Sequence, residues 1–345
     1  MRGLTISAHG TFDQLELRDD LPEPRLERET DVRVRIRAAA LNHLDLFLLG
    51  GLPGITITPP WVVGSDGMGV VESVGAAVTH VAVGDTVLLN PGTSDRTCEY
   101  CLSGDQPLCR HYRINGEHVP GTLAELLVTP GVNVARAAPE TDLAEGAAFP
   151  LATLTAWRMM TTRARVTADD HVLIWGIGGG VAIACLQIAK LLGARVTVTS
   201  GSDDKLVRAR ALGADDTINH RGLDVGREMR ARTNKRGVDV VVDSVGEASW
   251  AQSLGAVGKR GRIVTCGGTS GPTLTTDVRK LFWNQWTILG STMGSESEFA
   301  EIVAHFNAGR LRPPIDRVYD LRDAVQAYER LASGEQFGKV VVRLP

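Results

Sequence analysis

The chain has 345 residues, more than one hydrophobic core usually serves, so its length predicts two domains. Hydrophobic residues make up 43% and charged residues 22%, which excludes disorder, collagen or a coiled coil as the main state. The formal net charge of −3 gives no reason to expect a nucleic-acid partner, and no apolar run reaches the roughly 18 residues of a membrane span. The first residues lack the pattern of a secretory signal, so we expect a cytoplasmic protein.

Turn signals recur roughly every ten positions up to about residue 140, and short runs with β propensity lie between them. The clearest runs are Val32–Ile36, Val70–Val74 and Thr86–Leu89. This pattern predicts an irregular, mostly β domain over residues 1–150.

From about residue 150, short apolar runs alternate with helical segments. Apolar strands of this kind indicate a sheet covered on both faces, and their alternation with helices indicates a parallel, doubly wound sheet. We therefore expect an α/β domain over residues 151–290. The predicted strands are His171–Trp175, Arg195–Thr199, Val238–Asp243, Arg262–Cys266 and Thr287–Leu289, and the predicted helices are Val181–Leu192, Asp203–Leu212, Gly222–Arg232, Ala248–Val257 and Val278–Trp283.

The last part of the chain predicts two amphipathic helices and a strand. One helix covers Ser297–Asn307, the second begins at Asp320, which is a good N-cap residue, and the strand covers Lys339–Val342.

A glycine-rich turn joins the first predicted strand of the α/β region to its first helix. Such a turn lets the backbone approach an anion closely, and free N–H groups at the helix N-terminus bind the charge. The surrounding strand–helix units favour a dinucleotide pyrophosphate over a purely structural turn. The residues expected to bind the cofactor here are Gly176, Gly178, Gly179, Gly180 and Val181.

The residues at the end of the second predicted strand indicate whether the cofactor is NADP(H) or NAD. NAD sites usually place an acidic residue there, whereas this chain has Ser200, which leaves room for a 2′-phosphate. Ser202 and Lys205 could bond that phosphate. The sequence therefore favours NADP(H), but Asp203 and Asp204 could instead meet a ribose hydroxyl, which keeps NAD open.

Two more loops follow the third and fourth predicted parallel strands. Ligands bind at the carboxyl ends of such strands. We therefore expect cofactor contacts from Ser244 and Val245 in one loop and from Gly267 and Gly268 in the other.

Three of the five cysteines, Cys98, Cys101 and Cys109, lie within 12 residues of a polar loop. Thiolates at this spacing suit tetrahedral zinc, and a closed structural site needs a fourth ligand. Asp95 continues the spacing by threes, and His111 is the alternative. Reduced surface thiols or one disulfide would be the competing interpretation, but a thiol cluster in an otherwise cysteine-poor cytosolic chain favours a metal.

Several motifs taken together resemble the medium-chain dehydrogenases/reductases, in order along nearly the whole chain. The resemblance implies a GroES-like catalytic domain over residues 1–150, completed by 291–345, a Rossmann domain over 151–290, and an active site in the cleft between them. By analogy it places Thr155 near the nicotinamide, and Thr292, Met293 and Lys339 toward the cleft. The motifs are Asn42-His43-Leu44-Asp45, Gly64-Ser65-Asp66-Gly67-Met68-Gly69-Val70-Val71, Val83-Gly84-Asp85-Thr86-Val87, the cysteine loop, Leu154-Thr155-Ala156-Trp157 and the glycine-rich turn.

The chain departs from the zinc alcohol dehydrogenases of this superfamily at the catalytic metal. Asn42, Ser65 and Leu151 stand where those enzymes have zinc ligands, so the resemblance implies a structural zinc and no catalytic zinc. Asn42 and Asp45 also fit the N-x-x-D motif of the quinone oxidoreductase and enoyl reductase branches. Phe47 stands where those branches often have a tyrosine, so a tyrosine proton donor is not expected.

The candidate catalytic residues are Asn42, His43, Asp45 and Asp66. Asn42 could bond ribose or substrate, or merely cap a turn, and His43 could contact the pyrophosphate, relay protons or lie exposed on a helix. Asp45 and Asp66 are expected to be structural anchors more than acids.

Without a metal to stabilise an alkoxide, we expect NADPH-dependent reduction of a quinone or an activated C=C bond. An alcohol dehydrogenase or aldehyde reductase is the alternative enzyme, and a non-catalytic NADPH-binding protein is the alternative of another class. The expected partners are a small-molecule substrate and a second copy of the chain, as a homodimer or homotetramer. The resemblance implies that the aromatic run from Phe282 to Trp286 lies at a subunit interface, and the alternative is that it lines a substrate cleft.

Overall fold

The computed structural model describes all residues, 1–345, which form two compact units. Unit 1 comprises Met1–Leu154 and Gly294–Pro345, and unit 2 comprises Thr155–Met293. These bounds differ by three or four residues from the domains expected from the sequence: 151–154 belong to unit 1, and 291–293 to unit 2.

A seven-stranded sheet forms the centre of unit 1, in the order β10-β6-β5-β3-β18-β17, with β9 paired to β3. The long strand β3 alternates between the core and the surface: Val32, Val34 and Ile36 are fully buried, whereas Arg33 and Arg35 both pair with Glu72. The strands of this sheet are β3 (Asp31–Ala40), β5 (Asp66–Val74), β6 (Thr86–Leu89), β9 (Leu126–Pro130), β10 (Val134–Arg136), β17 (Ile315–Asp320) and β18 (Lys339–Arg343).

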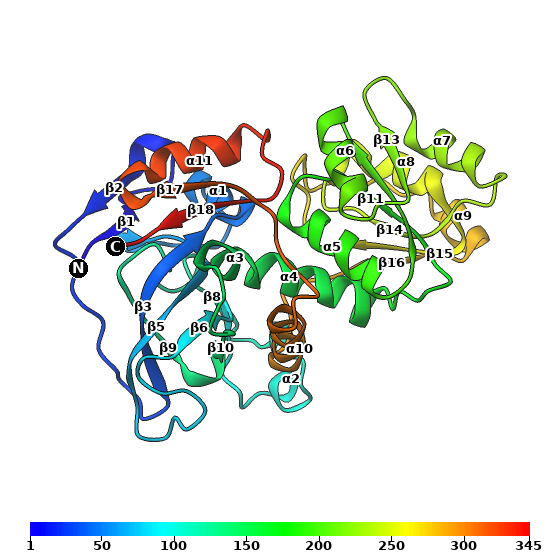
Figure 1. Ribbon diagram of the computed structural model, residues 1–345. Coiled ribbons are helices and arrows are strands. Elements are labelled where there is room, and N and C mark those ends of the chain that lie inside the picture. Colours follow the sequence, from blue (N-terminus) through cyan, green and yellow to red (C-terminus); the bar gives the residue numbers. More distant parts are fainter. The chain divides into compact units, whose positions relative to one another are not determined.

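The C-terminal strand β18 lies beside β3, so the end of the chain meets its first part (red and blue ribbons in Figure 1). Val341 faces Ala40 in this antiparallel pair, and the N–H of Leu41 donates to the carbonyl of Val340 over 2.9 Å. This register brings Lys339, the first residue of β18, next to Asn42, which follows β3.

Smaller elements complete unit 1. One sheet has the order β2-β1-β4, and a two-stranded ribbon supports the cysteine loop. A single core, which includes Leu48, Leu89 and Tyr328, joins the large sheet to α1 and α11. The elements are β1 (Gly3–Ile6), β2 (Leu15–Arg18), β4 (Trp61–Val62), β7 (Gly92–Thr93), β8 (Arg113–Ile114), α1 (His43–Gly50), α2 (Glu99–Leu102), α3 (Leu143–Ala148), α10 (Glu296–Asn307), α11 (Ala324–Ala332) and the short 3₁₀ turns Phe12–Gln14, Gln106–Leu108, Gly131–Asn133 and Leu321–Asp323.

Unit 2 is a doubly wound, parallel six-stranded sheet in the order β13-β12-β11-β14-β15-β16 (Figure 1). Numbered within the unit, this is the 3-2-1-4-5-6 order of dinucleotide-binding folds. The strands are β11 (His171–Ile174), β12 (Arg195–Ser200), β13 (Asp216–Asn219), β14 (Val238–Val242), β15 (Val257–Thr265) and β16 (Thr287–Gly290). The helices are α5 (Gly180–Leu191), α6 (Asp203–Ala211), α7 (Val225–Arg232), α8 (Glu247–Ala256) and α9 (Val278–Asn284), preceded by α4 (Pro150–Trp157) and a π-helical stretch over Arg158–Arg163.

The expected GroES-like and Rossmann architecture is confirmed, and most predicted elements lie within three residues of their observed bounds. In the part of the chain after residue 150, two strands were missed, β13 and β17, because their polar residues hide the apolar pattern of a strand. Strand β15 begins at Val257, five residues before the predicted start. Past Asp320 the chain first makes the 3₁₀ turn, and α11 begins only at Ala324, since Asp320 makes no capping bond. No helix of the protein is long and apolar enough to cross a membrane.

Candidate functional site

Asn42 and Asp45 are positioned by the N-terminus of α1. Asn42 is the N-cap residue, and its backbone N–H donates to Asp45 Oδ2 over 2.7 Å. This reciprocal bond satisfies an N–H group that the helix itself leaves unpaired. The Asn42 side chain itself bonds to Asp66, at the beginning of β5.

Asn42, Asp66 and Lys339 form a buried polar network, which we call the Lys339 network. Lys339 Nζ lies 2.5 Å from Asn42 Oδ1 and 2.9 Å from Asp66 Oδ2, and Asn42 Nδ2 donates to Asp66 Oδ2 over 2.9 Å. The backbone N–H of Leu151 donates to Asp66 Oδ1 over 2.7 Å. The side chains of Lys339 and Asp66 are 4% and 0% exposed, so a charged pair is held almost wholly out of water.

Local backbone chemistry fixes the lysine end of this network. Gly338 has φ +104°, and a Cβ there would lie 2.1 Å from the Pro314 carbonyl oxygen. Only glycine can therefore stand before Lys339 without moving the chain. Lys339 was expected to contact the cofactor, and within the protein its ammonium donates to Asn42 and Asp66.

The residues around the network do not form a second zinc site. Leu151 offers no donor side chain, Ser65 is a hydroxyl, and the Asn42 oxygen already accepts from Lys339. A cationic ammonium within bonding distance of both Asn42 and Asp66 also opposes a divalent cation. The donor chemistry thus agrees with the expectation that a catalytic zinc is not held here.

Two further candidates lie beside the network. Burial raises the pKa of the Asp45 carboxyl to about 7. His43 is exposed on α1, and desolvation by surrounding protein, together with the charge of Lys339, lowers the pKa of its imidazole. Tyr328 of α11 is fully buried. Burial, and then the charge of the Asp45 carboxyl, raises the pKa of the Tyr328 phenol.

The cysteine loop gathers four donors. Ligand atoms of Asp95, Cys98, Cys101 and Cys109 all lie within 4.8 Å of one another, and the Sγ atoms of Cys98 and Cys101 are 3.6 Å apart. Zinc–sulfur bonds of about 2.3 Å in a tetrahedron place two sulfurs about 3.8 Å apart, so the cluster fits zinc. Burial raises the pKa of Cys101 to about 12, so a bound cation is needed to hold this thiol as thiolate.

The structure favours Asp95 over His111 as the fourth zinc ligand. His111 Nδ1 lies 2.8 Å from Asp95 Oδ2, and the N–H groups of Thr97 and Cys98 donate to Asp95 Oδ1. These bonds, that from His111 most of all, hold the pKa of Asp95 well below its usual range. An imidazole that orients a ligating carboxylate is a common outer partner of a metal site.

In unit 2 the glycine-rich turn leads from β11 to α5. Gly176 and Gly178 have φ +67° and +135°, and Gly179 is an N-cap residue without a side-chain capping bond. A Cβ on Gly179 would meet no atom within 4 Å, so open space lies before the uncapped N–H groups that begin with Gly180 and Val181. This arrangement fits a pyrophosphate.

The predicted loops after β14 and β15 lie together. Asp243 accepts the N–H groups of Val245 and Gly246, each over 3.0 Å, which fixes the first loop. The carbonyl of Ser244 accepts from Thr269 N–H over 3.2 Å, so this loop packs on the one that contains Gly267 and Gly268.

Three other expected cofactor residues, Thr155, Thr292 and Met293, lie at the two ends of unit 2. Thr155 Oγ1 lies 3.9 Å from Met293 Sδ, and both residues are buried. Thr292 is exposed beside Met293. The structure therefore brings Thr155 and Met293 together within the unit.

The end of β12 carries a basic pair that sequence reasoning missed. A Cβ on Gly201 would lie 3.0 Å from Arg221 Nε and 3.2 Å from His220 Nε2, so both side chains cover the turn between Ser200 and Ser202. They follow β13, and the failure to predict that strand concealed their place beside β12. Burial, and then the charge of Arg221, lowers the pKa of His220.

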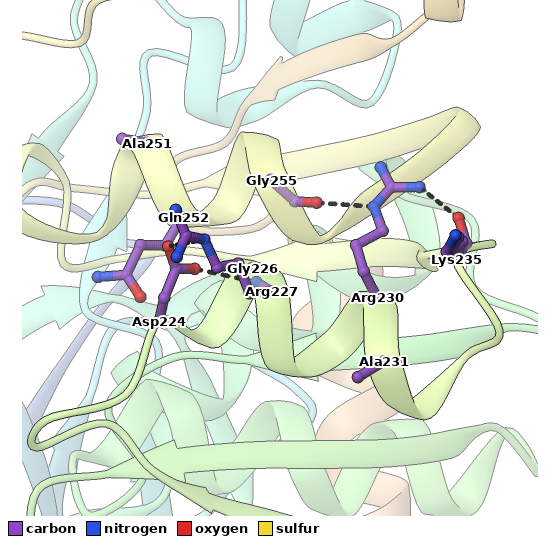
Figure 2. Close-up of a pocket in the computed structure, with 9 residues that line it drawn as sticks. All are labelled: Asp224, Gly226, Arg227, Arg230, Ala231, Lys235, Ala251, Gln252 and Gly255. Carbon is purple, nitrogen blue, oxygen red and sulfur yellow. Dashed lines mark hydrogen bonds and ion pairs between the residues drawn. The ribbon is translucent and has the colours of Figure 1, made fainter.

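A cavity of about 470 Å³ between α7 and α8 is not the functional site (Figure 2). Its one half-buried cation, Arg230, donates to the carbonyls of Gly255, Lys235 and Val257. These bonds connect α7 to the neighbouring backbone, so the Arg230 guanidinium stabilises the fold and is not available to a ligand.

The comparisons with known proteins agree with this architecture. Residues 28–139 match the alcohol dehydrogenase GroES-like domain, and residues 180–308 match the zinc-binding dehydrogenase family. A zinc-type alcohol dehydrogenase-like protein of Schizosaccharomyces pombe is 32% identical, with 96% of each chain covered. The human quinone oxidoreductase is 26% identical, with 100% of this chain and 98% of that protein covered.

A crystal structure of an NAD-dependent alcohol dehydrogenase superposes with a TM-score of 0.96 at 42% identity, over 100% of both chains. The chain therefore belongs to the medium-chain dehydrogenase/reductase superfamily. Within that superfamily it is an oxidoreductase built from a GroES-like and a Rossmann unit.

Replacement of a zinc ligand should release the metal. We expect Cys101→Ser to lower the zinc content below about one ion per chain and to lower the thermal midpoint of unfolding. The control Cys185→Ser, in α5, should leave the zinc content unchanged. Asp95→Asn should lower the affinity for zinc more than His111→Ala does. Loss of a residue that only orients a metal ligand typically lowers the metal affinity by about 10- to 100-fold. Elemental analysis and competition with a chelator measure both quantities, and a larger loss in the histidine variant would reverse the ligand assignment.

Asp45 should make the stability of the protein depend on pH. Its carboxyl stays protonated in the folded chain up to about pH 7, whereas in the unfolded chain it ionises near pH ~3.9. The folded state therefore binds the extra proton in this window, and this group makes the free energy of unfolding fall as pH rises. Asp45→Asn should remove that fall in urea titrations, and parallel profiles for variant and wild type would contradict it. Asp13→Asn is the control, because hydrogen bonding lowers the pKa of that exposed carboxyl.

Proposed function

We propose that the protein is an NADP(H)-dependent oxidoreductase that transfers hydride to a quinone or to the activated C=C bond of an enone or enal, without a catalytic metal. The observation that carries the proposal is the Lys339 network, in which an ammonium and a carboxamide stand where a Lewis-acid site would need free donors.

The choice of acceptor follows from the charge that each reaction develops. Alcohol oxidation needs the hydroxyl proton removed as hydride leaves, which zinc supports by stabilising an alkoxide. An electron-poor acceptor spreads the incoming charge into its carbonyl oxygen, so a fixed hydrogen-bond donor suffices. The chain's own contribution is to bind the two partners, orient them and exclude water.

NADP(H) would supply the hydride, and unit 2 carries the residues to hold it. Gly176, Gly178 and the N-terminus of α5 would bind the pyrophosphate. Ser200, Ser202 and Lys205 would surround a 2′-phosphate, and Arg221 adds positive charge at the same turn, where His220 lies beside it. A structural zinc would be held by Asp95, Cys98, Cys101 and Cys109.

A second enzyme function has one specific observation in its favour. The relative with 42% identity is described as an NAD-dependent alcohol dehydrogenase. Interconversion of an alcohol and an aldehyde or ketone, with NAD, is therefore the alternative, and it would require proton transfer without zinc.

We further propose that the chain forms a homodimer through the outer edge of unit 2. Strand β16 is the last strand of the sheet, and one of its edges has no partner strand. Phe282 and Trp283 of α9 are 64% and 75% exposed beside it, and Ile288 of β16 is 39% exposed. A twofold axis can pair such an edge with its own copy and cover the apolar side chains.

Turnover of a panel of acceptors tests the proposed function. We expect fast oxidation of NADPH, followed by its absorbance, with benzoquinone and hexenal, and little reduction of NADP⁺ with ethanol or cyclohexanol. The experiment uses the purified chain with zinc retained. Rapid alcohol oxidation, with quinones and enals ignored, would establish the alternative instead, and cofactor binding with no turnover would leave a non-catalytic binding protein.

The preference for NADPH over NADH should depend on Arg221. Arg221→Ala should raise the KM for NADPH about 10-fold, since a hydrogen bond to a charged group contributes about 1.5 kcal/mol or more. The KM for NADH should change by less than about twofold, because NADH has no 2′-phosphate. Arg227→Ala, at an exposed arginine of the same unit, is the matched control. Equal changes for both cofactors would show that Arg221 does not read the phosphate.

A further inference from the structure

Lys339 retains one uncommitted N–H group. An ammonium carries three donors, and here two of them donate to Asn42 Oδ1 and Asp66 Oδ2. No protein atom accepts the third. A buried donor without an acceptor is costly, so the third N–H of this side chain, which is 4% exposed, is available to a ligand atom.

The neighbours of Lys339 leave the ammonium as the one group of the network that can act on a ligand. Both polar atoms of the Asn42 carboxamide are already hydrogen-bonded. Its oxygen accepts from Lys339, and its nitrogen donates to Asp66. Asp66 accepts from three donors, including the Leu151 N–H. Both residues therefore hold the lysine in place, and neither offers a free donor of comparable strength.

The kind of atom that the ammonium would meet follows from its charge and its surroundings. Lys339 has only donors to offer, so the ligand atom is an acceptor, and a partial negative charge on it strengthens the bond. Asp66 offsets the positive charge, so a full anion gains little in the ground state. A neutral carbonyl oxygen that gains charge during reaction gains most.

We propose that Lys339 is a catalytic residue whose third N–H donates to the carbonyl oxygen of the acceptor and stabilises the oxyanion that hydride transfer creates. The proposal rests on the proposed function and deepens it, because it restricts the acceptors to those whose reducible bond is conjugated to a carbonyl. Lys339 then supplies the positive charge that a metal supplies in the zinc enzymes of the superfamily.

The step balances without another reactant. The acceptor gains a hydride at its β carbon, where a C–H bond forms, and the nicotinamide that gave it is oxidised. The C=C π pair forms a new double bond between the α carbon and the carbonyl carbon. The carbonyl π pair moves onto the oxygen, which lies beside the Lys339 N–H. Water then protonates the resulting enolate, and the ammonium keeps its own protons. With a quinone, the carbon that received the hydride then loses one proton to water while an oxygen gains one, which gives the aromatic hydroquinone.

The experiment removes the charge and compares two kinds of acceptor. Lys339→Met alone would leave Asp66 buried without its partner, so the double variant Asp66→Asn, Lys339→Met supplies a neutral version in which position 66 still accepts the Leu151 N–H. The matched control is Lys190→Met, Asp215→Asn, which removes a surface lysine–aspartate pair of 2.8 Å from unit 2. Benzoquinone forms an oxyanion when reduced, whereas methylene blue is a cation that accepts hydride without forming one.

We expect kcat with benzoquinone to fall by about 10²- to 10³-fold in the double variant, the loss typical of one oxyanion donor, with KM changed by less than about threefold. With methylene blue, and in the control, kcat should change by less than about threefold. An equal loss with both acceptors would assign Lys339 a structural role only, and an unchanged kcat with benzoquinone would also overturn the proposal.

A binding measurement keeps this proposal separate from the proposed function. Para-nitrophenol imitates the reduced acceptor, and its phenolate has its own absorbance band. Lys339 should lower the pKa of the bound phenol by about one to three units in wild type and not in the double variant. Wild type that shows this shift but does not reduce quinones would refute the proposed function alone, whereas equal titrations in the two proteins would refute the role of Lys339.

Discussion

The ion pair between Lys339 and Asp66 is the interaction on which the candidate site depends. Removing one partner of such a buried pair leaves an uncompensated charge, at a typical cost of about 3–5 kcal/mol. The pair also joins distant parts of the chain, because Asp66 begins β5 and Lys339 begins the last strand, β18. The register of β18 on β3 and the glycine at position 338 are what bring the ammonium to Asn42.

Two polar sites of opposite chemistry therefore lie in the same unit. The cysteine loop gathers sulfur and carboxylate donors with no cation among them, which suits a zinc ion. The Lys339 network contains its own cation, so its carboxylate is already neutralised. Under the proposed function, the chain would keep a structural metal while its reaction site works with a protein charge.

The names of the relatives divide between alcohol dehydrogenases and quinone oxidoreductases, although all share the fold. Fold alone does not decide between these chemistries. The side chains at a few positions do, because an alkoxide and an enolate place different demands on the group that faces the substrate oxygen. At those positions this chain has Asn42, Ser65 and Leu151, and Lys339 donates to Asn42 and to Asp66.

The sequence by itself determined the two-unit architecture, the glycine-rich turn and the cysteine cluster, since each depends on residues that are close along the chain. Apolar periodicity and short-range spacing carry that information. Strands β13 and β17 escaped prediction because their polar residues are stabilised by neighbouring strands rather than by their own pattern.

Only the tertiary structure decided which charges meet. Lys339 lies 273 positions from Asp66, and nothing in local sequence links the two. Arg221 and His220 reach the turn at Gly201 only because β13 pairs with β12. The Leu151 N–H is a backbone donor that every residue except proline has, so no side-chain signal could announce it. Long-range register places such groups, and register is a property of the folded sheet rather than of any one segment.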